Sequence, residues 1–164
     1  RINLSKMITF NNQNKVYTLK TEQELPITLK RSWDFFSSPK NLFKITPEHM
    51  NFKILTDFKK MYEGQIIKYK VSPFPFFRVG WTTKITYVEE PFSFIDKQVS
   101  GPFRLWEHTH TFKKKNNKLL ACDIVKYKLP LGLIGRIFGG AIVKYQLNKI
   151  FEYRNKQLNK IFNK

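Results

Sequence analysis

Apolar and polar residues alternate along most of the chain between positions 16 and 128. A period of two is typical of β-strands that bury one face. The alternation predicts seven strands, over residues 16–25, 52–56, 65–71, 78–89, 93–99, 105–113 and 118–128. Gly, Pro or Asn stands at most of their boundaries, and the pair Asn116–Asn117 predicts a tight hairpin that sets Lys115 opposite Lys118.

Helical patterns occur in two places. Thr28 can cap a short helix that ends at Phe36, and Ser38 can cap a second one that ends at Ile45. Between Ala141 and Phe162 there is no Gly or Pro, and apolar residues recur at helical spacing, which predicts one long amphipathic helix. A strand, two short helices, six strands and a long helix, in this order, predict an α+β fold with an antiparallel sheet and the helix on one face.

The domain organisation follows from length and polarity. A chain of 164 residues is long enough to bury a sizeable core, and one domain is the default. Residues 1–15 are polar and without period, so we expect an N-terminal tail or short extension there and a single domain over 16–164.

Composition limits the compartment and the partners that we expect for the protein. The single cysteine, Cys122, excludes an intrachain disulfide and favours a reducing compartment, so we expect a cytoplasmic location. We find no run of about 18 apolar residues that would span a membrane. The net charge of +18 leaves an anionic membrane surface open as a partner, although the excess of lysine together with Asn, Ile and Phe also fits a compositional bias. No nucleic-acid-binding motif is recognisable, so we do not expect nucleic acid as a partner.

The stretch GPFRLWEHTHTF carries the most distinctive chemistry. As a strand, it places Trp106, His108, His110 and Phe112 on one face. The hairpin register then sets His110 opposite Asp123. A buried carboxylate needs a partner, and the imidazole is available. This pair could be a satisfied polar pair in the core, a recognition site for a ligand's polar group, or an acid–base pair in which His108, His110 and Asp123 are catalytic.

Two further candidates concern metal and charge. The spacing of His108 and His110 suits a metal site, but a third ligand is needed, and His49, Asp123 and Glu107 are the candidates that the sequence offers. We expect no metal site and no cofactor. Arg154 falls on the apolar stripe of the long helix, where we expect its guanidinium to extend to the edge of the core. The alternative is that it reaches an acidic ligand or Asp96.

Four segments resemble one known superfamily. They are LPITLKRSWDFFSSPKNLFKITP, GWTTKITYVEEPFSFIDKQVSGPFRLWEHTHTF, DIVKYKLPLGLIGRIFGG and LNKIFEYRNKQL, in this order along the chain. Together they resemble an uncharacterised bacterial subgroup of the START-like superfamily, the polyketide cyclase/dehydrase and lipid-transport group known as SRPBCC. The resemblance implies the helix-grip fold, in which a curved antiparallel sheet grips the C-terminal helix around an apolar cavity. It does not imply one activity, because the superfamily includes carriers, receptors, cyclases and oxygenase subunits.

Alternation selects the residues that should face such a cavity. We expect it to be lined by Tyr69, Trp81, Thr83, Phe94, Gln98, Trp106, His108, His110, Asp123 and Tyr127. By the same parity, Ile85, Tyr87 and Asp96 should point inward. Two apolar loops, at 73–77 and 130–140, are candidate gates through Phe74, Phe76, Leu131, Leu133, Ile134 and Phe138.

Three functions remain open at this point. The first is non-catalytic binding or carriage of a hydrophobic small molecule, such as a lipid, an isoprenoid or a polyketide-like compound. The second is an enzyme of the cyclase or dehydratase type that uses the histidines and Asp123 as acid–base groups. The third is a module that docks on a membrane surface or on another protein.

Overall fold

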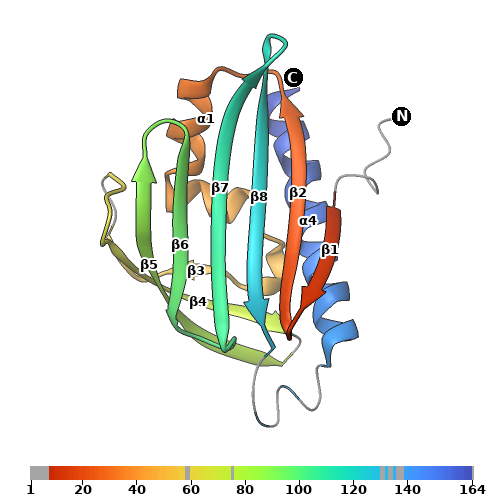
Figure 1. Ribbon diagram of the computed structural model, residues 1–164. Coiled ribbons are helices and arrows are strands. Elements are labelled where there is room, and N and C mark those ends of the chain that lie inside the picture. The colour runs from red at the N-terminus through yellow and green to blue at the C-terminus, as the bar shows by residue number, and fades with distance from the viewer. Residues whose placement is uncertain are drawn as a thin grey trace.

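An eight-stranded antiparallel sheet forms the body of the protein (Figure 1). The computed structural model describes residues 8–57, 60–74, 76–129, 132, 135 and 139–163, without the side chain of Phe74. The strands are β1 (Ile8–Gln13), β2 (Val16–Leu25), β3 (Lys53–Ile54), β4 (Ile66–Phe74), β5 (Phe77–Glu89), β6 (Ser93–Ser100), β7 (Leu105–Lys115) and β8 (Lys118–Lys128). Their order across the sheet is β1-β2-β8-β7-β6-β5-β4-β3. β2 therefore pairs with β8, the last strand along the chain.

The helices lie where capping residues start them. They are α1 (Leu29–Phe36), α2 (Pro39–Leu42), η2 (Phe43–Ile45), η3 (Glu48–Met50) and α4 (Gly140–Phe162). The Thr28 hydroxyl accepts a hydrogen bond from the Arg31 amide at 3.2 Å, as the sequence predicts. Ser38 makes no such bond, and Pro39 at the first helical position starts α2 instead. The second predicted helix therefore ends at Leu42 and continues as the 3₁₀ turn η2.

The sheet has one strand more than the seven predicted. Residues 8–13, which we expected to belong to a polar tail, form β1 and pair with β2 through a turn in which Asn14 and Lys15 have positive φ. An edge strand contacts only one neighbour and can be polar on both faces. Most of β1 is exposed, so its sequence shows no strong alternation.

A β-bulge changes the parity of β5. The pairing of β5 with β6 shifts in register between Ile85 and Tyr87. An extra residue at a bulge sends the following side chains to the opposite face. Consequently Ile85 is buried as predicted, but Tyr87 is exposed and Val88 packs against the core in its place.

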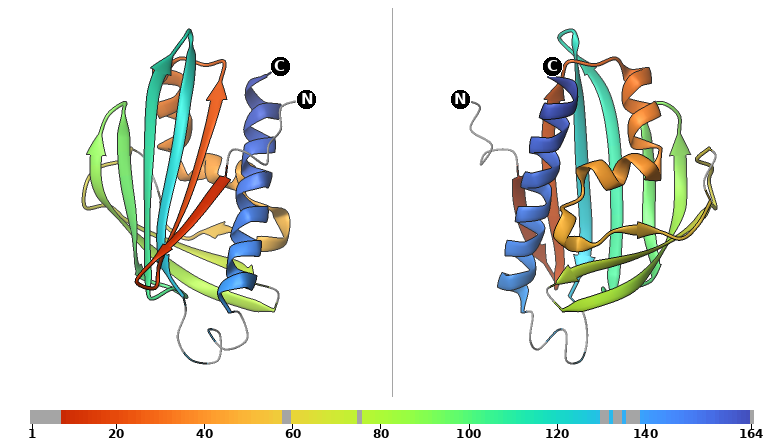
Figure 2. Two further views of the ribbon diagram at one scale, coloured as in Figure 1. Left: turned by 45° about the vertical axis from the view of Figure 1, so that its right-hand side comes forward. Right: turned by 180° about the vertical axis from the view of Figure 1, so that it is seen from behind.

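The core lies between the concave face of the sheet and the helices. Figure 2 shows the sheet curving so that α1, α2 and α4 all lie on one side of it. The buried apolar side chains form two clusters. One contains Leu25, Ile85, Phe112 and Leu158, and the other contains Leu19, Trp81, Val125 and Phe151.

A row of polar residues separates the two clusters. We call it the polar belt, and it consists of Thr21, Thr83, Asp96, His108, His110, Asp123, Arg154 and Asn155. Along β2, for example, Thr21 lies between Leu19 of one cluster and Leu25 of the other. All belt residues except Asp96 are less than a tenth exposed. Among the described helices, none combines the length and hydrophobicity that a membrane-spanning segment needs.

Candidate functional site: an apolar cavity with one polar wall

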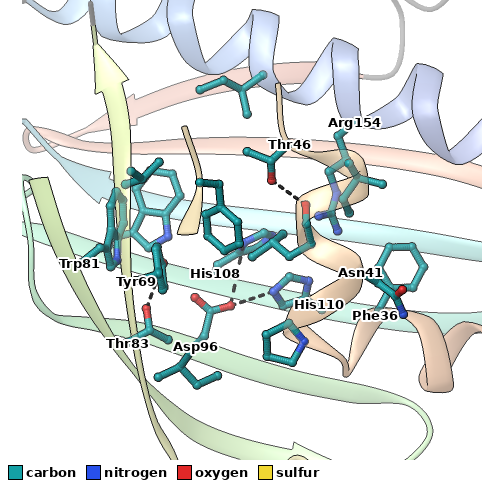
Figure 3. A pocket seen from close by; sticks show the side chains of 18 of the residues that line it. Phe36, Asn41, Thr46, Tyr69, Trp81, Thr83, Asp96, His108, His110 and Arg154 are labelled. Atoms are coloured by element: carbon teal, nitrogen blue, oxygen red, sulfur yellow. Dashed lines mark hydrogen bonds and ion pairs between the residues drawn. The ribbon is translucent and has the colours of Figure 1, made fainter. Parts of the chain in front are cut away.

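A cavity of about 200 Å³ lies between the sheet, α4 and the short helices. It is smaller than the several hundred Å³ that is usual for small-molecule sites. Its walls are mostly apolar and come from segments that are far apart in the sequence, among them Phe36, Met50, Trp81 and Phe151. Figure 3 shows the exception, a wall where Asp96, His108 and His110 lie side by side and Arg154 approaches from the helix.

Asp123 is the centre of the buried part of this wall. Its Oδ1 atom lies 2.8 Å from His108 Nε2, 3.0 Å from Arg154 Nη2 and 3.1 Å from His110 Nδ1. The contacts with His108 and Arg154 are hydrogen bonds, whereas His110 Nδ1 is within ion-pair distance without hydrogen-bond geometry. One carboxylate oxygen therefore faces three nitrogen atoms.

Asp96 lines the cavity together with the two histidines. Its Oδ2 atom accepts a hydrogen bond from His110 Nε2 at 2.8 Å and lies 4.0 Å from His108 Nδ1, which is too far for a hydrogen bond. Across the cavity wall, the Tyr69 hydroxyl lies 3.3 Å from the Thr83 hydroxyl. The two histidine rings stack on each other with centroids 3.7 Å apart, and His110 also stacks on Phe94.

The surroundings push the two imidazoles in opposite directions. Burial lowers the pKa of His108, and the neighbouring His110 lowers it further. Burial also opposes the charged form of His110, but its contacts with Asp123 and Asp96 outweigh burial and raise its pKa. Although burial again opposes the charge, Arg154 and the two histidines hold the pKa of Asp123 well below its usual value. The surroundings therefore favour the charged form of His110 and the neutral form of His108.

Solved structures resemble this fold over nearly its whole length. A START superfamily protein from Mycobacterium smegmatis superposes with a TM-score of 0.67 at 13% identity, over 89% of this chain and 97% of that one. A protein from Chromobacterium violaceum gives 0.68 at 15% identity, over 90% and 97%. Ara h 8.0201 gives 0.54 at 12% identity, over 88% and 99%. No family model matches the sequence, and no curated protein matches it significantly.

The chain has the helix-grip fold of the START superfamily. This confirms the α+β fold that the sequence predicts and the fold that its resemblance to that superfamily implies. At these identities, the likeness concerns the fold alone.

The lining of the cavity includes seven of the ten predicted residues. They are Tyr69, Trp81, Thr83, Phe94, Trp106, His108 and His110. Asp123 lies behind the histidines rather than on the cavity surface. The Gln98 side chain instead holds the backbone of Phe103, donating to its carbonyl at 2.6 Å and accepting from its amide at 3.1 Å. Tyr127 is completely buried, with its ring stacked on Tyr17, and burial raises its pKa to about 12.

The predicted gate falls largely outside the part of the chain that the structure describes. Leu131, Leu133, Ile134 and Phe138 lie outside the described residues, as does the Phe74 side chain. Phe76, in the turn between β4 and β5, is fully exposed. A gate at these loops stays a prediction.

The predicted register is confirmed, but the hydrogen bonds run diagonally across it. His110 lies opposite Asp123 and His108 lies opposite Val125, as predicted. Asp123 nevertheless bonds to His108, and His110 bonds to Asp96. Diagonal neighbours on one sheet face are within reach of long side chains. The prediction that Arg154 extends to the edge of the core is wrong, because its guanidinium is buried against Asp123.

The sequence indicates Asp96 and Arg154 as inward-facing candidates but does not identify their partners. Asp96 has the correct parity to face inward, yet only the β6–β7 register, which sets it opposite His108, identifies it as a partner of the histidines. Arg154 can be paired with Asp123 only once α4 is placed over the sheet. The short helices also contribute lining residues, such as Asn41 and Thr46, that show no period to reveal them.

One group of side chains has the composition of a metal site. Ligand atoms of Asp96, His108 and His110 lie within 4.8 Å of one another. Their geometry fits an ion pair better than a metal centre. The two rings are inclined by only 29° with their centroids 3.7 Å apart, so their planes do not meet about 2 Å from the nitrogens, where a metal bound in both planes would lie. His49 and Glu107 do not belong to this group.

Proposed function

We propose that the protein binds a hydrophobic small molecule in the cavity between the sheet, α4 and the short helices, and leaves this molecule chemically unchanged. The observation that carries this proposal is that the cavity is lined mostly by apolar side chains, while its ionisable groups Asp96, His108 and His110 gather at one wall. Burial of apolar ligand surface supplies affinity, and a few convergent polar groups fix orientation. The fold supports the proposal because proteins of this superfamily commonly hold hydrophobic ligands in the same place.

The size of the cavity limits the ligand. A buried water molecule needs roughly 10–15 Å³ of cavity volume. The cavity of about 200 Å³ therefore has room for on the order of a dozen waters. Aromatic rings line much of the wall, including Trp81, which stacks on Tyr69, and Trp106, which meets Trp81 edge to face. A compact ring system or a short chain fits this space better than a long acyl chain does.

Two measurements test the proposal. Native mass spectrometry of the protein as purified should reveal a bound species, which denaturation releases. Naphthalene, a compact apolar probe, should bind to the protein with a Kd that Val71→Trp raises at least about tenfold, because Val71 lines the cavity. Val99→Trp is the matched control, since Val99 is exposed on β6. Equal binding by the wild-type protein and both variants would overturn the proposal, provided that circular dichroism shows all three folded.

An acid–base enzyme is the second candidate, and one observation favours it. His108 donates Nε2–H to Asp123, as a general base oriented by a carboxylate would, while its Nδ1 atom has no hydrogen bond to Asp96. The released ligand distinguishes the two functions. An enzyme would convert it on repeated incubation with fresh protein, and His108→Gln would abolish the conversion. A carrier would return it with unchanged mass.

A further inference from the structure

We propose that the cavity selects ligands whose polar end is an uncharged hydroxyl group and discriminates against carboxylates of the same shape. This inference rests on the proposed function and names the chemical class of the ligand. It follows from the hydrogen-bonding capacity left at the polar wall and from the balance of buried charge around it.

The first step concerns the tautomer of His108. A carboxylate oxygen only accepts hydrogen bonds, so the 2.8 Å contact with Asp123 requires a proton on His108 Nε2. In the neutral imidazole, the other nitrogen then carries a lone pair. That nitrogen, Nδ1, is 4.0 Å from Asp96 and makes no hydrogen bond with any residue that the structure describes. His108 therefore offers one acceptor on the cavity wall.

The second step concerns His110. Both of its ring nitrogens face carboxylate oxygens, Nε2 at 2.8 Å from Asp96 and Nδ1 at 3.1 Å from Asp123. Each of these contacts is favourable only if the nitrogen carries a proton, and an imidazole protonated at both nitrogens is a cation. The raised pKa of His110 and the lowered pKa of His108 agree with this assignment.

The third step is the charge balance of the wall. Asp96 and Asp123 contribute two negative charges, and His110 and Arg154 contribute two positive charges, so the buried group is neutral before any ligand enters. A carboxylate ligand would add an unbalanced negative charge next to Asp96, at a wall whose other charged groups are buried. Buried like charges repel strongly, and a buried charge without a partner is unfavourable.

Arg154 does not remove this penalty. Its Nη2 atom is 3.0 Å from Asp123, and the side chain is only 6% exposed. A ligand carboxylate that reached another donor of Arg154 would share this one cation with Asp123, so the wall would still hold one more negative than positive charge. A hydroxyl group avoids this imbalance, because it donates one hydrogen bond to His108 Nδ1 and adds no charge.

Three matched probes test the inference in the intact protein. They are naphthalene, 2-naphthol and 2-naphthoic acid, which share one ring system and differ in the polar end. At pH 7 a phenol is uncharged and a carboxylic acid is ionised. We expect 2-naphthol to bind about two- to tenfold more tightly than naphthalene, the gain of one neutral hydrogen bond. We expect 2-naphthoate to bind at least about tenfold more weakly than 2-naphthol.

A substitution of His108 tests whether this residue is the source of the preference for a hydroxyl group. His108→Leu should abolish the preference for 2-naphthol over naphthalene, and His49→Leu should keep it, because His49 is exposed in η3. The ratio of the two affinities within one variant is insensitive to a general loss of stability. If His108→Leu fails to fold, long-range ¹H–¹⁵N spectra of the wild-type protein give the second readout, since 2-naphthol should shift the His108 Nδ1 resonance and naphthalene should not.

The outcomes separate the inference from the proposed function. Equal affinities for 2-naphthol and naphthalene, or tighter binding of 2-naphthoate than of 2-naphthol, would overturn the hydroxyl preference while leaving an apolar binding cavity. Failure of all three probes to bind would count against the proposed function as well. An unchanged His108 resonance in the presence of bound 2-naphthol would also overturn the inference.

Discussion

The two ends of the polar belt differ in what their hydrogen bonds are used for. At the end near β2, Asn155 Nδ2 donates to the Thr21 hydroxyl at 3.2 Å, and both residues are almost fully buried. At the other end, Thr83, Asp96 and His108 lie on the cavity wall. The first end joins the helix to the sheet, whereas the second presents polar groups to a space that a ligand can enter.

The polar belt can therefore serve both the stability of the fold and the binding of a ligand. A buried hydrogen bond between two elements fixes their relative position, because losing either partner leaves an unsatisfied polar group. A polar group on a cavity wall avoids that penalty, since a ligand or water can satisfy it. Asp123 and Arg154 lie between the two ends and connect them. Substitutions along the belt should therefore change stability at one end and binding at the other.

The largest effect is expected at the centre of the belt. Asp123→Ala leaves Arg154 buried without its carboxylate, which should lower the free energy of unfolding by about 3–5 kcal/mol. Urea unfolding at pH 7 measures this loss. Glu22→Ala is the control, because the Lys20–Glu22 pair is half-exposed and an ion pair in water contributes little to stability. Equal losses in the two variants would mean that Asp123 is not a structural centre.

A smaller effect is expected at the end near β2. Asn155→Ala removes the bond to Thr21 and leaves its buried hydroxyl without this donor, which should lower the free energy of unfolding by about 1–3 kcal/mol. Its affinity for naphthalene should stay unchanged, because Asn155 does not line the cavity. Urea unfolding and probe titration on the same sample check both halves. A clear loss of probe affinity would show that the two ends are not separable.

At the cavity end of the polar belt, Asp96→Asn should act mainly on the pKa of His110 and less on the free energy of unfolding. The pKa of His110 should fall, since one of the two carboxylates that raise it is removed, and an NMR titration of the imidazole signals measures this. A group whose pKa rises on folding stabilises the protein below its unfolded pKa of about 6.5, and this contribution is lost as pH rises through the folded value. The wild-type advantage in stability should therefore shrink on going from pH 6 to pH 9.

Two results would contradict this assignment. An unchanged His110 titration in Asp96→Asn would mean that Asp123 alone sets the charge of His110. A wild-type advantage that grows with pH would mean that His110 is not charged in the folded protein.

The smallest effect is expected at the hydroxyl pair of the cavity wall. Tyr69→Phe removes a long hydrogen bond of 3.3 Å to Thr83, so the free energy of unfolding should fall by no more than about 1 kcal/mol. The ring would keep its stacking on Trp81. Thermal unfolding resolves a change of this size in a chain of 164 residues as a shift in Tm of roughly 2–4 °C. A loss comparable to that of Asn155→Ala would place Tyr69 with the structural residues instead.

Local sequence patterns were sufficient for most of the sheet. The bounds of β2 and β8 agree with the predicted ranges, and the register of the β7–β8 hairpin follows from its two-residue turn. Where the pattern weakens, the prediction does too. β1 was missed because an edge strand needs no alternation, and Tyr87 was placed on the wrong face because a bulge is invisible to a strict period of two.

Alternation and turn length are local properties of the chain, and they are enough to place Trp106, His108, His110 and Phe112 on one face and Asp123 across from His110. The carboxylate that each histidine bonds could not be predicted in this way, because a diagonal contact depends on side-chain rotation and on the neighbouring strand that brings Asp96. The burial of Arg154 and the volume of the cavity likewise depend on how α4 packs over the sheet. Packing joins residues 31 positions apart, such as Asp123 and Arg154, and no local period encodes such a contact.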